Sequence, residues 1–168
     1  MSAPEFSRMV DLRALPAGEI MLEANADERA ALATRFGLVA IEALTATVTL
    51  APRADGIDAA GRLAAEIVQS CAISGDDLPV TIAEPLAFRF VPERPIDAEE
   101  IELAAEELDE IAYQGNAFDL GEAVAQSLAL AIDPYATGPE AERVRAEAGL
   151  STPEASGPFA ALAALRKD

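Results

Sequence analysis

The side chains that could carry chemistry in this chain are carboxylates and one thiol. The 168 residues hold 30 acidic and 12 basic side chains, so the formal net charge is −18, and histidine is absent. The only cysteine is Cys71, and the only lysine is Lys167. This composition excludes serine–histidine and cysteine–histidine catalysis, histidine metal sites and a phosphate-loop lysine. Acid–base chemistry by Asp and Glu, oxygen-ligand metal sites and an unassisted Cys71 remain.

More than half of the net charge is concentrated in one segment, from Glu93 to Glu122. It has a single basic residue, Arg94, among these acids: Glu93, Asp97, Glu99, Glu100, Glu102, Glu106, Glu107, Asp109, Glu110, Asp119 and Glu122. Its apolar residues are too sparse to secure a buried helix, so we expect a mobile acidic connection or a loosely packed helix at about residues 93–118. The acids lack the ligand spacing and glycine of a calcium loop, so we expect neither a metal site nor a cofactor.

The stretch around the thiol, residues 61–74, decides the fold. Leu63, Ala65 and Ile67 alternate with more polar residues, which is typical of a strand with one buried face. The spacing of Leu63, Ile67 and Cys71 also fits a helix, and alanines favour helix.

Turn signals on both sides favour the strand. Asp55-Gly56 is a hairpin signal upstream, and residues 74–77 form a turn signal downstream. The stretch is then the middle of a three-strand meander over about residues 39–91. Pro79 and Pro85 in the third strand each remove a ladder donor, which favours an edge position or a bulge.

Capping signals define two helices. Asn25 and Glu28 form a capping-box pair and Gly37 is a stop signal, which predicts a helix at about 26–36. Asp119 with Glu122 opens a second helix, which Asp133-Pro134 ends, at about 119–132. Short strands are expected before the first helix, at residues 6–10 and 19–23.

These elements predict an α+β fold with an antiparallel sheet or a partly open barrel built on the meander. We expect one domain over residues 1–135, a flexible linker with at most a little helix over 136–157, and a short amphipathic tail over 158–168. No apolar run approaches the length of a membrane span, no basic leader precedes an apolar stretch, and a lone cysteine allows no internal disulfide. We therefore expect a cytoplasmic protein that contacts no membrane.

Several pieces of the sequence, in their order and spacing, resemble the YceD family of large ribosomal RNA subunit accumulation proteins. They are Glu5-Phe-Ser-Arg8, Glu28 to Leu38, Val68-Gln-Ser-Cys71, Phe118-Asp-Leu-Gly-Glu122 with Leu128 to Pro134, and Pro158-Phe159. The family is associated with accumulation of large-subunit rRNA in bacteria and plastids, and its gene commonly lies beside that of a large-subunit ribosomal protein. The resemblance implies a role in ribosome assembly or in processing or stability of 23S rRNA, and transfers no catalytic residue.

The sequence departs from many relatives at the central stretch. Where they carry Cys-X-X-Cys, the first position here is Val68 and only Cys71 remains. A zinc site or dithiol switch is therefore not carried over, and we expect Cys71 to be a buried structural thiol.

Charge and resemblance together indicate a non-enzymatic factor that acts through protein surfaces. We expect the acidic segment to contact a basic ribosomal protein or large-subunit assembly factor, with any effect on rRNA indirect and no contact with DNA. Two alternatives stay open: direct RNA recognition by clustered arginines such as Arg8, Arg62 and Arg89, and a carboxylate metal-dependent nuclease. The candidate partner-binding residues are Arg62, Gln69, Ser70, Cys71, Glu106, Glu107, Asp109, Glu110, Phe159 and Leu162.

Overall fold

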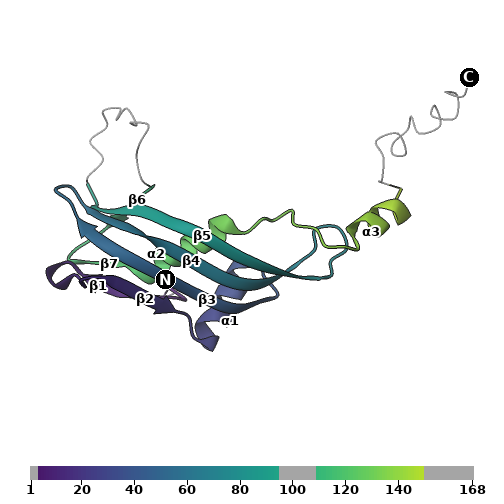
Figure 1. Cartoon of the computed structure of the whole chain (residues 1–168), viewed down its shortest axis with the longest axis horizontal. Helices are drawn as coiled ribbons and strands as arrows, with labels where there is room; N and C mark the ends of the chain where they lie inside the picture. The colour runs from purple at the N-terminus through teal and green to yellow at the C-terminus, as the bar shows by residue number, and fades with distance from the viewer. Residues whose placement is uncertain (1–3, 95–108, 150–168) are drawn as a thin grey trace, which may run out of the picture.

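The computed structural model describes residues 4–94 and 109–149 of the chain. Its long strands run side by side along the long axis, and the two longer helices lie beside them (Figure 1). In chain order the elements are β1 (Met9–Asp11), the short 3-10 helix η1 (Leu12–Ala14), β2 (Glu19–Glu23), α1 (Ala26–Phe36), β3 (Ala40–Pro52), β4 (Ile57–Ser70), β5 (Asp77–Pro92), β6 (Asp109–Tyr113), β7 (Ala117–Asp119), α2 (Leu120–Ala131) and α3 (Ala141–Glu147).

The main sheet has the order β2-β3-β4-β5-β6, and β1 pairs with β7 in a separate two-stranded sheet. All pairings are antiparallel except that of β5 with β6, which is parallel. The predicted α+β class and the three-strand meander are confirmed, with β4 at the centre of the sheet. The sheet forms no closed barrel in the described part of the chain.

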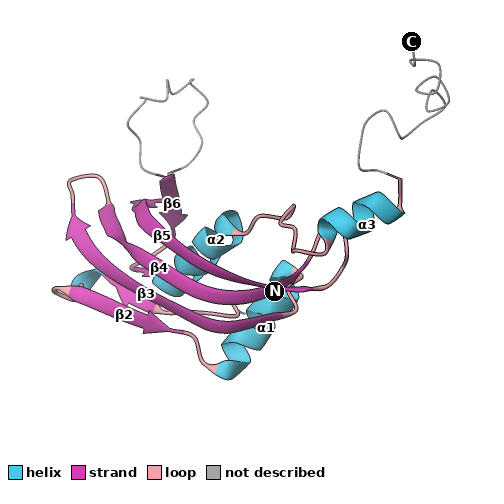
Figure 2. Cartoon of the chain, turned by 45° about the vertical axis from the view of Figure 1, so that its right-hand side comes forward, coloured by secondary structure: helices cyan, strands magenta, loops and turns pink. Residues whose placement is uncertain are grey.

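Helices α1 and α2 cover one face of the sheet (Figure 2). The strands alternate, so that Leu44 and Leu63 are buried beneath the helices, while Thr45 and Arg62 lie on the opposite, outer face and are exposed. Period-two alternation of this kind is what an antiparallel sheet with one solvated face requires. The core includes a stacked pair of rings from β5 and β7, and the largest fully buried side chains are Phe6, Phe90, Leu32, Leu44, Leu63, Ile67, Leu120, Leu128, Val48 and Val124.

Helix α1 has the predicted bounds because both of its ends are capped locally. The Asn25 side chain accepts a hydrogen bond from the Glu28 backbone N–H, and the Glu28 carboxylate accepts one from the Asn25 backbone N–H. At the other end Gly37 adopts the left-handed conformation at φ 66°, which glycine tolerates best. Asp119 likewise caps α2 by accepting from the Glu122 N–H.

The centre of the sheet depends on a close backbone approach at Gly61. A Cβ atom at this position would lie 1.8 Å from the backbone oxygen of Thr47 in β3. Only glycine fits there, so this residue has a packing reason to interrupt an otherwise regular strand.

Several predicted boundaries were wrong. The first strand is Met9–Asp11 rather than 6–10, because residues 6–8 instead pack against the helix ends. Strand β4 ends at Ser70, so Cys71 follows the strand, in a turn. Within the predicted acidic connection, residues 109–113 form strand β6, so this part is neither a mobile connection nor a loose helix. The segment has only a weak intrinsic preference for strand, and pairing with Phe88–Pro92 of β5 stabilises it. In the predicted linker, residues 141–147 form the short helix α3, which agrees with the expectation of at most a little helix there, and its Ala141 is buried.

The two prolines of β5 lie where its outer edge is open, as predicted. Strand β6 pairs only with Phe88–Pro92, so the preceding part of β5, with Pro79 and Pro85, has no second neighbour among the described residues. The predictions for residues 95–108, including Glu106 and Glu107, and for the tail with Phe159 and Leu162 lie outside the described residues. Among the helices described, none is long and apolar enough to cross a membrane.

Candidate functional site

A groove of about 620 Å³ lies where the open edge of β5 meets β6 and α2. Strand β5 contributes one wall, the start of β6 closes one end, and α2 forms the other wall. The residues that line it are Glu84, Pro85, Leu86, Ala87, Phe88, Asp109, Glu110, Ile111, Ala123, Gln126, Ser127, Leu130 and Ala131.

Apolar side chains form much of the groove. Leu86 and Phe88 point from β5 toward the helices and are buried, while Ile111 of β6 is half-buried. Leu130 on α2 is 85% exposed, which is unusual for a leucine beside a core. The groove therefore offers apolar surface that this part of the chain leaves uncovered.

The charged side chains of the groove are all acidic. Glu84, Asp109 and Glu110 are exposed, and no arginine lines the groove. Within the described residues none of the three forms an ion pair. The sequence identified Asp109 and Glu110 through the acidic segment, but Glu84 was missed because a single acid on a strand carries no signal.

The candidates around the thiol form a structural corner rather than an open site. Gln69 is buried and its side chain donates to the backbone oxygen of Asp133 at 2.8 Å, while Ser70 is exposed at the end of β4. The backbone N–H groups of Ser74 and Gly138 both donate to the sulfur of Cys71, at 3.4 and 3.2 Å.

These hydrogen bonds set the protonation of the thiol. Hydrogen bonds from Ser74, followed by that from the Gly138 backbone, lower the pKa of Cys71 from 9.0 to about 6, against the opposing effect of burial. The thiol is buried, as expected, and it ties the segment after α2 to the β4–β5 turn. Its described surroundings fix a turn and leave the sulfur little access.

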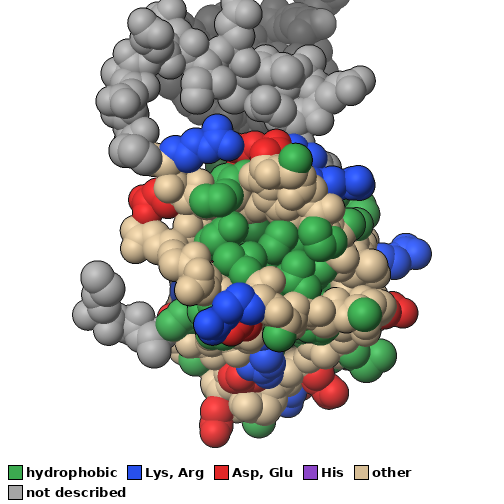
Figure 3. Space-filling view, turned by 90° about the vertical axis from the view of Figure 1, so that its left-hand side faces the viewer, with side chains coloured by type: hydrophobic (Ala, Val, Ile, Leu, Met, Phe, Trp, Pro, Cys, Tyr) green, Lys and Arg blue, Asp and Glu red, His purple; other side chains and the backbone are tan. Residues whose placement is uncertain are grey.

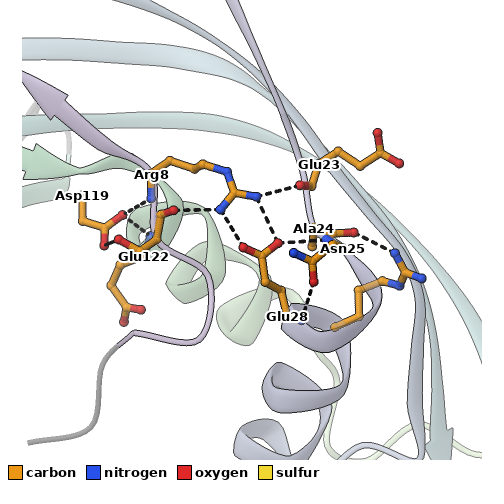
Figure 4. Close-up of polar contacts among 9 residues, drawn as sticks. Arg8, Glu23, Ala24, Asn25, Glu28, Asp119 and Glu122 are labelled. Carbon is orange, nitrogen blue, oxygen red and sulfur yellow. Dashed lines mark hydrogen bonds and ion pairs between the residues drawn. The ribbon is translucent and has the colours of Figure 1, made fainter.

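Three of the sequence pieces that carry the family resemblance meet at the helix N-termini (Figure 4). The Arg8 guanidinium donates to both carboxylate oxygens of Glu28, at 2.7 and 3.0 Å, and to the backbone oxygen of Glu23. Asp119 accepts from the Arg8 backbone N–H and from the Ser7 hydroxyl while it caps α2. These contacts join the N-terminal segment to the caps of both helices, which is a role in stability.

Arg35 extends the same network on the surface. It donates to both carboxylate oxygens of Glu122, at 3.0 and 2.8 Å, and to Glu5 at 3.0 Å. The hydrogen bond with Arg35 is the main cause that lowers the pKa of Glu122.

The arginines considered for RNA recognition do not form one cluster. Arg8 lies in the helix-cap network. Arg62 and Arg89 share the outer face of the sheet, but Arg89 is paired with Asp58 at 2.6 Å. The structure therefore does not bring these three arginines together in one patch.

A different pair of arginines lines an apolar hollow of about 370 Å³ at one end of the molecule. Figure 3 shows hydrophobic side chains gathered at the centre of this end, with basic side chains around them. Leu12, Leu15 and Tyr113 line the hollow together with Arg53 and Arg94. Because these residues come from distant parts of the chain, no local sequence signal could identify the hollow.

The described residues contain no group of three or more His, Cys, Asp or Glu side chains placed to hold a metal ion. The acids of the groove come from two strands, Glu84 from β5 and Asp109 with Glu110 from β6, and each is exposed. In this part of the chain their arrangement suits contact with a cationic surface better than coordination of one ion.

Comparison with known proteins gives one match. A family model described as "Large ribosomal RNA subunit accumulation protein YceD" matches residues 59–166, which is more than half of the chain. The matched region contains every residue that lines the groove. Neither the curated proteins nor the solved structures that were compared with the chain give a match.

Proposed function

The chain belongs to the YceD family of large ribosomal RNA subunit accumulation proteins, and from this premise we propose that it supports that rRNA by binding a basic protein. The family name indicates large-subunit rRNA accumulation as the role. The partner in this proposal is a ribosomal protein of the large subunit or an assembly factor, and the effect on rRNA is indirect.

The acidic groove is the observation that carries the proposal. It combines exposed Glu84, Asp109 and Glu110 with the apolar surface of Leu130, and its lining contains no basic residue. Ribosomal proteins must bind phosphate and are therefore rich in Lys and Arg. A partner with apolar and basic side chains gains both hydrophobic burial and charge complementarity here.

The overall charge supports contact with protein rather than with RNA. A net charge of −18 repels phosphate backbones, whereas it accelerates encounter with a cationic protein. While bound, the acidic chain would shield the basic partner from premature contact with RNA.

The proposal is non-enzymatic. Histidine is absent from the sequence, and the one thiol is buried with its sulfur held by backbone N–H groups. The three acids of the groove are spread over two strands along an open surface. A binding role requires only that the acids be exposed on one surface, which they are.

Two experiments test the proposal. Deletion of the gene should lower the ratio of large-subunit to small-subunit rRNA, and an unchanged ratio would contradict the role. In the second, the tagged full chain should retain purified basic large-subunit ribosomal proteins at low salt and release them at high salt, since exposed charge pairs are screened. Binding that does not change with salt would contradict the electrostatic mechanism.

Direct RNA binding is a second candidate, which the apolar hollow favours. Tyr113 and the neighbouring apolar side chains could stack on an unpaired base, while Arg94 contacts its phosphate; Arg53 beside them is paired with Asp58 at 2.8 Å. A gel-shift assay with precursor rRNA tests this candidate. Loss of binding in Arg94→Ala but not in Arg62→Ala, on the outer face of the sheet, would support it, and absence of any shift would exclude it.

A further inference from the structure

The groove contains an open strand edge as well as acids and apolar side chains. In the described structure β6 pairs with β5 only from Phe88 onward, so the part of β5 that lines the groove, Glu84–Ala87, has β4 as its one neighbour. Side chains of Ala83, Pro85 and Ala87 are exposed beside this edge. A segment that continued the line of β6 past Asp109 would fit directly against it.

The side to which each backbone N–H and C=O group of β5 points can be deduced from Glu93, the residue just after the strand. Glu93 donates its backbone N–H to the backbone oxygen of Tyr113 in β6. Residues two apart in a strand direct their backbone groups to the same side. The N–H groups of Ala83 and Ala87 and the carbonyl of Pro85 are therefore directed away from β4 and into the groove.

The two prolines fit this assignment and restrict what can bind. Pro79 and Pro85 are both at positions of β5 whose backbone nitrogen is directed away from β4. No hydrogen bond to β4 is lost there, so proline is tolerated. Prolines on an edge discourage indiscriminate pairing with other strands. Ala87 keeps its N–H, next to the start of β6, where a parallel partner strand would meet it.

We propose that this groove binds an extended basic segment of a partner protein, which adds to the edge of β5 in line with β6. Every second side chain of the segment would face the helices. Apolar ones in this set would pack on Leu86, Phe88 and Leu130, and Lys or Arg in the same set would lie near Glu84 and Asp109, which share that face. Strand addition supplies affinity through backbone hydrogen bonds, and the groove supplies selectivity through charge. This inference rests on the proposed function and specifies the binding mode and the partner segment.

Charge favours a partner over the chain itself as the occupant. The residues that precede β6 in the sequence, 95–108, contain no basic residue, and their acids are Asp97, Glu99, Glu100, Glu102, Glu106 and Glu107. Placing these beside Glu84, Asp109 and Glu110 would bring like charges together. A second copy of this chain, at −18, meets the same repulsion.

Hydrogen exchange of the full chain with a short peptide of repeating Lys-Thr-Val-Thr is the test, because in a strand it presents lysine and valine together on the face that Glu84 shares with Leu86. In the free protein the amides of Ala83 and Ala87 should exchange rapidly, and the peptide should slow both. A peptide of repeating Glu-Thr-Val-Thr should not bind. Slow exchange at Ala87 in the free monomer would assign the groove to the chain itself, and slow exchange with a dimeric mass would assign it to a second copy. Either result overturns the proposal.

Paired variants test the backbone contact and the charge separately. Ala87→Pro removes the proposed donor and should weaken peptide binding about tenfold, the effect of one net hydrogen bond, whereas Ala87→Val keeps the N–H and should bind like wild type. Glu84→Lys should also weaken binding, while Glu66→Lys on the outer face of the sheet should not. Equal peptide affinity in all four variants would overturn the proposal. If Ala87→Pro does not fold, the comparison of Glu84→Lys with Glu66→Lys decides whether the proposal stands.

The rRNA ratio in the deletion strain separates this inference from the proposed function. A lowered ratio with no peptide binding leaves the function standing and overturns the strand-addition mode. An unchanged ratio with groove-specific peptide binding contradicts the function and supports the groove as a peptide site.

Discussion

Arg8 and Glu28 form a bidentate ion pair in which Nη1 lies 2.7 Å from Oε1 and Nη2 lies 3.0 Å from Oε2. Glu28 is at the same time the capping-box residue of α1, and the Arg8 backbone N–H donates to Asp119, the cap of α2. One residue of the N-terminal segment therefore fixes the starts of both helices against the sheet.

Loss of this pair should destabilise the fold. Arg8→Ala should lower the free energy of unfolding by about 1–2 kcal/mol, because it removes charge-assisted hydrogen bonds that are partly shielded from water. Arg8→Lys should recover only part, since lysine cannot make the two-pronged contact. Urea denaturation followed by circular dichroism measures the change. Arg13→Ala, which breaks an exposed pair with Asp11, is the control and should have no measurable effect.

Asp119 should stabilise the fold in two ways, by capping α2 and by binding the N-terminal segment. Asp119→Ala should cost about 1–2 kcal/mol of unfolding free energy, since it leaves the Glu122 N–H uncapped and removes the acceptor for Ser7 and Arg8. Asp119→Asn keeps a capping oxygen and should be milder. Equal stability of the alanine variant and wild type in thermal denaturation would refute the assigned role.

Gly61→Ala should be the most damaging small substitution in the sheet. Its Cβ would lie 1.8 Å from the Thr47 backbone oxygen, so β3 and β4 would have to separate locally. We expect a loss of about 3 kcal/mol or more, the range of severe core disruption. Ala64→Gly, on the exposed outer face of the same strand, is the matched control and should cost about 1 kcal/mol or less. If Gly61→Ala is as stable as wild type, the close backbone contact between β3 and β4 at this position is not needed for stability.

The thiol should make stability depend on pH. Its pKa is about 6 in the folded chain, below the ordinary 9.0, because hydrogen bonds from Ser74 and Gly138 favour the thiolate. A lowered pKa contributes stability that is complete above pH 9, declines as pH falls from 9 to 6, and is absent below 6. The difference in unfolding midpoint between wild type and Cys71→Ala should therefore grow between these pH values as pH rises. A difference that stays constant would show an unperturbed thiol.

The sequence predicted those elements whose signals are local. The caps at Asn25, Glu28 and Gly37 define α1 because each acts within a few residues, and alternation defines β3 to β5 because one face must be buried. Strand β6 was not predicted because its partner, Phe88–Pro92, lies far away along the chain. Non-local parallel pairing leaves no pattern in a segment of five residues.

The candidate site was predicted in part for the same reason. Asp109 and Glu110 were found through composition, whereas Glu84 and Leu130 reach the groove only because β5 and α2 pack side by side. Gln69, which the sequence placed among the partner-binding candidates, is buried against Asp133 instead. A polar residue in an alternating strand gives no sign of which backbone oxygen it will meet.

The rRNA phenotype of groove variants tests the central claim most directly. The deletion strain would be complemented with wild type, with Glu84→Lys, Asp109→Lys and Glu110→Lys combined, or with Glu19→Lys, Glu23→Lys and Glu66→Lys, which make the same charge change on the outer face of the sheet. If the groove binds the basic partner, wild type and the outer-face variant should restore the ratio of large-subunit to small-subunit rRNA, and the groove variant, although folded, should not. Full restoration by the groove variant would contradict a binding role for the groove.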